Sequence, residues 1–370
     1  MSATGGATSL AERKRRAGQR LFIGIFGHDV TDETRRIVQE VQPGGYVLFA
    51  RNVVVPEQVA GLNRALCELA PSTHPALVAV DQEGGRVARI REPATTFPPM
   101  RAVGRADRPE LTERVGAVMA RELRAMGFHV DFAPCADVDS NPDNPVIGDR
   151  SFGPDPERVG AHVAAYVRGM QGEGIVACAK HFPGHGDTDL DSHKALPTVD
   201  RPIEELRRTE LPPFKAAVDA GVASVMTSHV MFPAWDAEWP CTLSDRILGP
   251  LLRDELGFDG LVFSDDLDMK AVADGWPIDV QVRRATEAGV DVLLCCNEPE
   301  RQLAVFEALV RLQEQSKAHE RAFVAAEERL QALRARFLGA KMSPVDLAEV
   351  GSEAHRSLAD EVRARGEWSV

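Results

Sequence analysis

Short apolar runs recur along most of the chain. Each is six to eight residues long, and few show the strict alternation of a half-exposed strand. Near-continuous apolar runs of this length are typical of parallel strands that are buried on both faces. We therefore predict eight strands, at Arg20–Gly27, Gly45–Ala50, Ala76–Asp81, Val130–Cys135, Val176–His181, Ser224–His229, Gly260–Asp265 and Val290–Cys296.

Segments with a helical period separate these runs. Glu110–Met126, for example, places Leu111, Val115 and Met119 on one face. Pro212–Pro213 is expected to split one helix into two pieces. The predicted helices are Thr31–Val41, Pro56–Leu69, Glu110–Met126, Pro156–Gly172, Ile203–Ala220, Ser244–Leu256, Ile278–Ala288 and Pro299–Gln315.

The alternation of eight strands with eight helices predicts an α/β fold, a single-domain (β/α)8 TIM barrel with a C-terminal helical extension. An open doubly wound sheet is the alternative, but it would have to place eight parallel strands without closure. We expect residues 1–19 to be a mobile N-terminal segment and residues 20–315 to form the catalytic barrel. Residues 316–370 are expected to form a helix and tail that pack on the barrel or trail from it.

Composition narrows the class of protein. The 370 residues carry a formal charge of −13, and such an acidic chain is a poor binder of nucleic acid or anionic membranes. The six cysteines show no framework spacing, and neither an apolar leader nor a membrane-spanning run is apparent. We expect a cytoplasmic monomer that binds a small molecule, with no nucleic-acid or membrane partner.

Reactive side chains gather where the predicted strands end. Asp81, His181, His229 and Asp265 each end a strand, and Asp137 and Asp139 follow the fourth strand. Five of the ten histidines fall at this rim: His28, His181, His185, His193 and His229. The active sites of TIM barrels lie at the carboxyl ends of their strands, so this rim is the predicted site.

The segment after the fifth strand, KHFPGHGDTDLDSHKALP (residues 180–197), is long and dense in His and Asp. It is open to three interpretations: a polar turn with satisfied histidines, a metal site built from His181, His185, Asp187 and His193, or acid–base chemistry by one histidine. Asp191 and His193 are two residues apart, so an extended segment places both on one side. A carboxylate beside an imidazole fixes its tautomer and raises its pKa.

The two neighbouring carboxylates Asp265 and Asp266 are expected to have different roles. Leu261, Phe263 and Asp265 share one face of the seventh strand, so Asp265 is expected at the barrel mouth, where a carboxylate is costly unless it is paired. Asp266 is expected to cap the following turn. Asp265 is therefore the better candidate for chemistry.

Seven motifs occur in order between about Phe22 and Cys296: GGYVLFARN, VDQEGGRVARIR, FAPCADVD, NPVIGDRSFG, KHFPGHGDTDLDSH, VMTSHV and ELGFDGLVFSDDLDM. With them the sequence resembles the bacterial β-N-acetylglucosaminidases of glycoside hydrolase family 3, the NagZ type. The resemblance implies a single-domain (β/α)8 barrel without a metal or other cofactor.

The resemblance also implies roles for matching positions. Asp265 matches the nucleophile, His193 the acid/base and Asp191 its dyad partner. The implied reaction is retaining hydrolysis through a covalent glycosyl-enzyme, with closure of the segment that carries His193. The implied substrate is a small saccharide or muropeptide, N-acetylglucosamine linked to 1,6-anhydro-N-acetylmuramic acid, released in cell-wall recycling. Residues matching substrate contacts are Asp81, Arg89, Arg150, Lys180, His181 and His229.

Three other functions stay open at this point. A phosphorylase of the same substrates is compatible with a histidine acid/base. A metal-dependent amidohydrolase would need an HxH pair after the first strand, where His28 stands alone. A non-catalytic sugar-binding barrel is the third. Trp235 and Trp239 either form an aromatic platform for the leaving group or pack over the rim.

Overall fold

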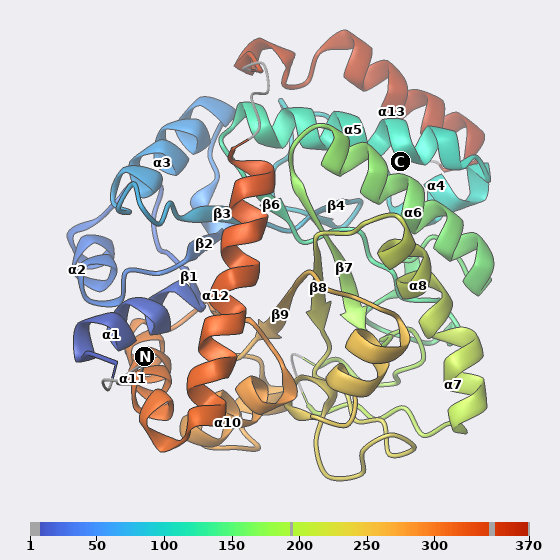
Figure 1. The fold of residues 1–370 in the computed structure, drawn as a ribbon. Coiled ribbons are helices and arrows are strands. Elements are labelled where there is room, and N and C mark those ends of the chain that lie inside the picture. The colour runs from blue at the N-terminus through green and yellow to red at the C-terminus, as the bar shows by residue number, and fades with distance from the viewer. Residues whose placement is uncertain (1–7, 193–194, 340–344, 369–370) are drawn as a thin grey trace, which may run out of the picture.

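Eight parallel strands close into a barrel in the order β1-β10-β9-β8-β7-β6-β3-β2 (Figure 1). The computed structural model describes residues 8–192, 195–339 and 345–368. The barrel strands are β1 Leu21–Gly24, β2 Gly45–Leu48, β3 Leu77–Val80, β6 Val130–Asp131, β7 Val176–Phe182, β8 Ser224–Thr227, β9 Leu261–Asp266 and β10 Val292–Cys295. An antiparallel hairpin, β4 Gln82–Gly84 and β5 Val87–Ala88, follows β3. The predicted (β/α)8 barrel is confirmed.

Helices surround the barrel and alternate with its strands. They are α1 Leu10–Gln19, α2 Asp32–Val41, α3 Pro56–Glu68, α4 Met100–Ala106, α5 Pro109–Ala125, α6 Pro156–Gly172, α7 Ile203–Thr209, α8 Leu211–Asp219, α9 Lys270–Ala273, α10 Ile278–Ala288, α11 Pro299–Gln315, α12 Lys317–Phe337 and α13 Glu353–Arg365. Shorter helical turns are η1 Ala50–Asn52, η2 Gly148–Arg150, η3 Cys241–Leu243, η4 Leu248–Glu255 and η5 Leu347–Glu349. Among the described residues, no helix combines the length and the apolar composition that crossing a bilayer requires.

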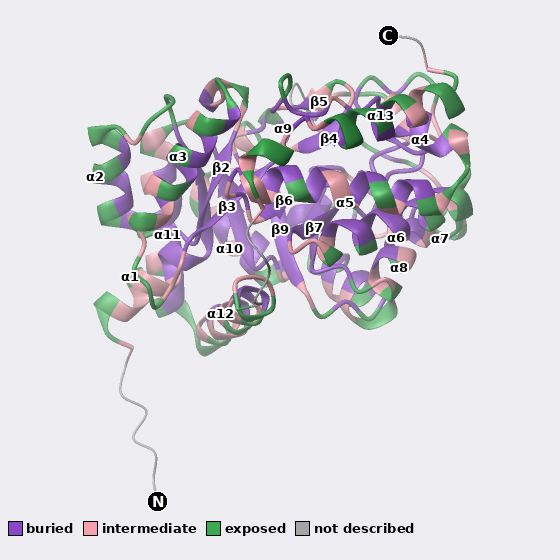
Figure 2. Cartoon of the chain, turned by 90° about the horizontal axis from the view of Figure 1, so that it is seen from above, coloured by how far each residue is buried: buried purple, intermediate pink, exposed green. Residues whose placement is uncertain are grey.

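Alternate residues of each strand face the barrel interior, which is filled with side chains. Phe263 packs edge-on against Phe22 at a centroid distance of 5.3 Å and against Phe132 at 5.4 Å. Leu330 and Leu333 of α12 join the same cluster and cover one end of the barrel. Figure 2 shows α12 on one side of the buried strands and the β4–β5 hairpin on the other. A solid interior leaves the hairpin end as the place for a site.

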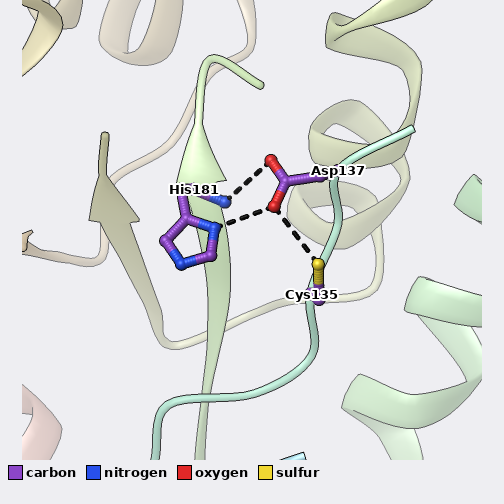
Figure 3. A group of neighbouring side chains, drawn as sticks. All are labelled: Cys135, Asp137 and His181. Carbon is purple, nitrogen blue, oxygen red and sulfur yellow. Dashed lines mark hydrogen bonds and ion pairs between the residues drawn. The ribbon is translucent and has the colours of Figure 1, made fainter. Parts of the chain in front are cut away.

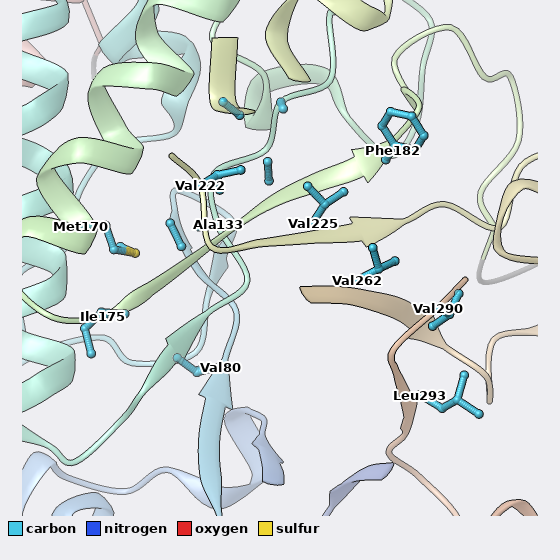
Figure 4. Close-up of a cluster of buried hydrophobic side chains, with 14 of the residues drawn as sticks. Val80, Ala133, Met170, Ile175, Phe182, Val222, Val225, Val262, Val290 and Leu293 are labelled. Atoms are coloured by element: carbon cyan, nitrogen blue, oxygen red, sulfur yellow. The ribbon is translucent and has the colours of Figure 1, made fainter. Parts of the chain in front are cut away.

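The outward-facing residues of the strands form a second, larger core against the helices. Val225, Val262 and Leu293 belong to it, together with Met170 and Ile175 from α6 and the turn after it (Figure 4). All five side chains are fully buried. Strand faces that are apolar on both sides explain why the sequence shows continuous apolar runs rather than alternation.

Three elements differ from the prediction in extent. The fourth strand is regular only over Val130–Asp131, because Pro134 has no N–H to donate; the chain continues beside β7 through a bridge between Cys135 and Lys180. The expected split helix divides at Glu210, and Pro212 lies in the first turn of α8, where no N–H is needed. The predicted Ser244–Leu256 helix is shortened to η4, with π-type hydrogen bonds.

The two ends of the chain pack on the barrel where the structure describes them. The sequence predicts a mobile segment over residues 1–19, whereas Leu10–Gln19 form α1, capped by the side chain of Ser9. Ala17 is fully buried, and Gln313 of α11 donates a 2.9 Å hydrogen bond to the carbonyl of Arg13. At the other end, His355 of α13 contacts buried Glu122 of α5 at 2.9 Å.

Candidate active site

A cavity of about 160 Å³ opens at the carboxyl ends of the barrel strands. Its wall brings together six of the nine predicted site residues: Asp81, Arg89, Arg150, Lys180, His181 and Asp265. These side chains come from segments far apart in sequence, and the closure of the barrel is what makes them neighbours. Asp191 is half-buried and is not part of the described wall, and His193 lies outside the described residues.

His229 is placed differently from the prediction. It is fully buried behind the wall, with Nδ1 2.8 Å from the Thr242 hydroxyl and Nε2 3.1 Å from the carbonyl oxygen of Asp266. The expectation that it contacts substrate is not supported by this position, because the imidazole supports the chain behind Asp266 instead of lining the cavity. A strand-end position alone does not tell which of two neighbouring residues faces the opening.

One wall of the cavity is a network of paired charges. Lys180 Nζ lies 2.6 Å from Asp81 Oδ1 and 2.7 Å from Glu83 Oε1. Arg150 forms a two-pronged pair with Glu83, at 2.9 Å from Nε and 2.8 Å from Nη2. Arg89 Nη2 reaches Asp81 Oδ2 at 3.3 Å. Three cations and two carboxylates give this wall a formal charge of +1.

The paired charges keep the two carboxylates ionised. Burial alone would raise the pKa of Asp81, but the charges of Lys180 and Arg89 outweigh it and leave the pKa below its usual range. The pKa of Glu83 is lowered for the same reason, since Arg150 and Lys180 outweigh burial. Charged groups fixed in this way can donate and accept directional hydrogen bonds to sugar hydroxyls without rearranging.

Asp137, which follows β6, holds His181 from behind (Figure 3). His181 Nδ1 is 2.8 Å from Asp137 Oδ2, and the backbone N–H groups of His181 and His185 donate to Oδ1 at 3.1 and 2.7 Å. Burial alone would raise the pKa of Asp137, but the charge of His181 and these hydrogen bonds outweigh burial and lower the pKa. With Nδ1–H bound to Asp137, the free electron pair of His181 lies on Nε2, 3.4 Å from Arg150 Nη2.

Cys135, Asp137 and His181 are the one group of donors, among the described residues, that approach closely enough to hold a metal ion. Their bonding does not fit one. Burial and the Asp137 charge raise the pKa of the Cys135 thiol, which donates to Asp137 Oδ2 at 3.2 Å. Both carboxylate oxygens are thus already occupied by donors, whereas a metal needs a thiolate and free lone pairs.

The candidate metal ligands predicted from sequence do not point toward a common centre, as far as the structure describes them. His185 pairs with the hydroxyls of Thr188 at 2.8 Å and Ser192 at 3.2 Å, and Asp187 forms an ion pair with Arg201. Three of the four candidate ligands therefore have partners within their own loop or beside it, and the fourth, His193, is outside the described residues.

Asp265 and Asp266 end β9, and both line the cavity, but they differ in their hydrogen bonds. Asp265 lines the cavity, and its Oδ1 accepts the backbone N–H of Asp266 at 2.8 Å. Asp266 accepts from the backbone N–H of Asp268 at 3.1 Å and that of Cys296 at 3.2 Å, so it ties β9 to β10. Burial and then the charges of Asp268 and Asp265 raise the pKa of Asp266 to about 7.

The sequence places Asp137 at the predicted rim without a role, and it does not single out Glu83. Asp137 was visible as a carboxylate following the fourth strand, and Glu83 lies inside the QEGG motif beside Asp81. Neither position reveals a partner, because Glu83 meets Arg150 and Asp137 meets His181 only through the closed barrel.

Residues 15–333 match the glycosyl hydrolase family 3 N terminal domain. The chain belongs to glycoside hydrolase family 3. The beta-hexosaminidase of Thiobacillus denitrificans is 43% identical over 288 residues, which cover 76% of this chain and 79% of that protein. That of Pseudomonas aeruginosa is 41% identical over 295 residues, covering 79% and 86%.

Solved family 3 structures superimpose closely. A β-N-acetylglucosaminidase from Paenibacillus has a TM-score of 0.90 and 37% identity, and the match covers 97% of this chain and 69% of that one. Native NagZ from Neisseria gonorrhoeae has a TM-score of 0.78 and 31% identity, with 94% and 97% coverage. The resemblance found in the motifs is confirmed, and this family 3 chain is a β-N-acetylhexosaminidase.

Proposed function

We propose that this enzyme is an exo-acting, retaining β-N-acetylglucosaminidase in which Asp265 is the nucleophile. The observation that carries the proposal is the position of Asp265, in the same small cavity as Asp81, Lys180 and Arg150, whose charges are paired with each other and with Glu83 behind them. A sugar bound by its hydroxyls to these charged groups presents its remaining edge to Asp265. The beta-hexosaminidase names of the relatives agree with this reaction.

The reaction then runs in two steps. Asp265 attacks the anomeric carbon and forms a glycosyl ester, while His193 protonates the departing oxygen. His193 next takes a proton from water, which attacks the anomeric carbon and releases Asp265. Asp191 is the proposed dyad partner that orients His193 and stabilises its charged form. Net retention follows from two inversions.

The residues of the charged wall bind and orient the sugar. Asp81 accepts from hydroxyls, and Arg89, Arg150 and Lys180 donate to hydroxyls and to the acetamido oxygen. His181 contributes Nε2 to the same surface. Because each donor is already held by a carboxylate, little ordering is needed when the sugar binds.

The natural substrate that we propose is N-acetylglucosamine linked to 1,6-anhydro-N-acetylmuramic acid, with or without peptide, in cytoplasmic cell-wall recycling. Incubation of the enzyme with purified muropeptides should release N-acetylglucosamine and the anhydromuramyl product, detected by mass spectrometry. Intact muropeptides beside rapid hydrolysis of short chitin fragments would contradict this choice of substrate.

The activity itself is tested with nitrophenyl N-acetyl-β-glucosaminide in the presence of EDTA. The wild type should release nitrophenol, and Asp265→Ala should lose at least about a thousandfold in kcat, as expected when a covalent nucleophile is removed. Asp259→Ala is the matched control, because Asp259 is exposed near the opposite end of β9. Adding phosphate should neither raise the rate nor yield a sugar phosphate. Full activity of Asp265→Ala would refute the proposal.

A further inference from the structure

The cavity is small, so a disaccharide that places one sugar in it extends its second sugar toward the rim. Its volume of about 160 Å³ is well below the roughly 300–1,000 Å³ of pockets that enclose a drug-sized ligand. Asp265 attacks from inside the barrel mouth, and an in-line displacement expels the leaving group away from the nucleophile. The leaving group therefore emerges over the rim.

The tryptophans that the sequence offered for this rim are turned elsewhere. Trp235 packs against Phe232 at a centroid distance of 5.5 Å, and Trp239 packs against Trp276 at 5.6 Å and under the guanidinium of Arg284. All three tryptophans contact the hydrophobic core, and none lines the cavity. The structure favours packing over a platform for Trp235 and Trp239.

An exposed ring is found instead beyond β1. Phe26 is 40% exposed, and it is the only aromatic residue among the large exposed hydrophobic side chains of the described chain. Its ring lies 4.7 Å from the guanidinium carbon of Arg51, which is 4.5 Å from the ring of Phe49. Phe49 lines the cavity. Phe26 is thus separated from the cavity wall by a single side chain.

The support beneath Phe26 is rigid. Arg51 donates to the carbonyl oxygens of Ile25 at 3.1 Å and Cys296 at 2.7 Å, and so joins the ends of β1 and β10. Asn52 donates to the carbonyl of Gly27 at 2.9 Å and also to that of Ile25. A ring held in place before binding loses little conformational entropy when a ligand stacks on it.

The neighbouring loop also carries exposed apolar side chains. Val54 and Val55, which follow η1 on the loop bonded to Phe26's own loop, are 55% and 42% exposed. The two loops are joined by hydrogen bonds from Asn52 to Gly27 and from Gln58 to His28, so their exposed apolar side chains are available to a ligand with an apolar face. The C–H face of a pyranose ring is such a ligand, and stacking on an aromatic ring satisfies it.

We propose that Phe26, supported by Arg51 and Phe49, is a specificity-determining residue that stacks against the leaving-group sugar of the substrate. The inference rests on the proposed function, because it places that sugar outward from Asp265. Phe26 makes no contact with the sugar that is being attacked. Its contribution should appear only with substrates whose leaving group is a sugar.

The test compares two substrates, diacetylchitobiose, whose leaving group is a sugar, and methyl N-acetyl-β-glucosaminide, whose leaving group is methanol. Phe26→Ala should lower kcat/KM for the disaccharide by roughly three- to tenfold, the size of one aromatic contact, and leave the methyl glycoside unchanged. Phe26→Tyr should retain most of the disaccharide activity. Ile203→Ala, which removes a 37% exposed side chain on α7, is the matched control and should change neither value.

The outcomes separate the two proposals. If Phe26→Ala lowers kcat/KM equally for both substrates, or for neither, the role of Phe26 is overturned while the glycosidase proposal stays intact. A folded wild type that cleaves neither substrate refutes the glycosidase proposal instead. Thermal unfolding of each variant confirms that the comparison is between folded proteins.

Discussion

Asp137 contacts His181 and two backbone N–H groups at once, and its role is to position the imidazole rather than to touch substrate. In Asp137→Asn an amide N–H replaces the acceptor at Nδ1, so the imidazole must present N–H at Nε2, toward Arg150. We expect kcat/KM to fall by about ten- to a hundredfold, the effect of losing one charge-assisted hydrogen bond.

The control for this prediction is Asp139→Asn, since Asp139 pairs with Arg101 and contacts neither His181 nor the cavity wall. The kcat/KM of both variants is measured across pH, together with their thermal unfolding. A purely structural role for Asp137 would lower stability without altering the pH profile, and that result would contradict the positioning role.

Asp266 makes stability depend on pH near neutrality. Its pKa is about 7 in the folded protein, against an ordinary value of 3.8, so the folded state binds a proton that the unfolded chain releases. Stability from this group is therefore lost as pH rises from about 4 to about 7. Asp266→Asn cannot ionise, and its melting temperature relative to wild type should be higher at pH 8 than at pH 5. A difference that does not vary with pH would exclude ionisation of Asp266 as the cause.

At the scale of elements, the first half of the segment after β7 is firmly seated. Asn144 donates to the carbonyls of His185 at 2.8 Å and Gly186 at 2.9 Å. A Cβ on Gly186 would lie 1.6 Å from the carbonyl oxygen of Val138, so only glycine allows this close approach. The conformation of this turn therefore depends on Gly186, which has no side chain to take part in catalysis.

Gly186→Ala should displace the turn and reduce both stability and activity, by about 2 kcal/mol in the free energy of unfolding for a buried steric clash. Gly172→Ala is the control, because a Cβ at Gly172, which ends α6, meets no atom within 4 Å. Chemical denaturation measures both. Equal stability of the two variants would show that the turn shifts without cost.

The strands of the barrel could be predicted from sequence, whereas some contacts of the site could not. Continuous apolar runs identified all eight barrel strands, because each strand is buried on both faces. Strand ends identified Asp81, Lys180, His181 and Asp265, since parallel strands place these ends at one rim. His229, Glu83 and Asp137 show the limit: which way a rim residue points, and which partner it meets, depend on contacts with segments that are not adjacent in the sequence.

At the scale of the whole molecule, buried histidines limit stability in acid. Burial lowers the pKa of His129, His162 and His185 to about 4. Each stays neutral in the folded protein and binds a proton near pH 6.5 when unfolded, so stability is lost as pH falls from about 6.5 to 4. We expect the melting temperature to drop steeply in this range. His162→Gln, on α6 and away from the cavity, should flatten the drop, and an unchanged slope would contradict the assignment.

In the proposed reaction Asp265 forms a covalent bond to the sugar, within a barrel that supplies all the other groups. The most direct test is the intact mass of the enzyme mixed with a fluorinated N-acetylglucosaminyl substrate that slows release of the intermediate. The wild type should gain one glycosyl mass, located at Asp265 by peptide mapping, and Asp265→Ala should gain none. Turnover with no adduct and an inverted first product, or an adduct at another residue, would contradict the proposed reaction.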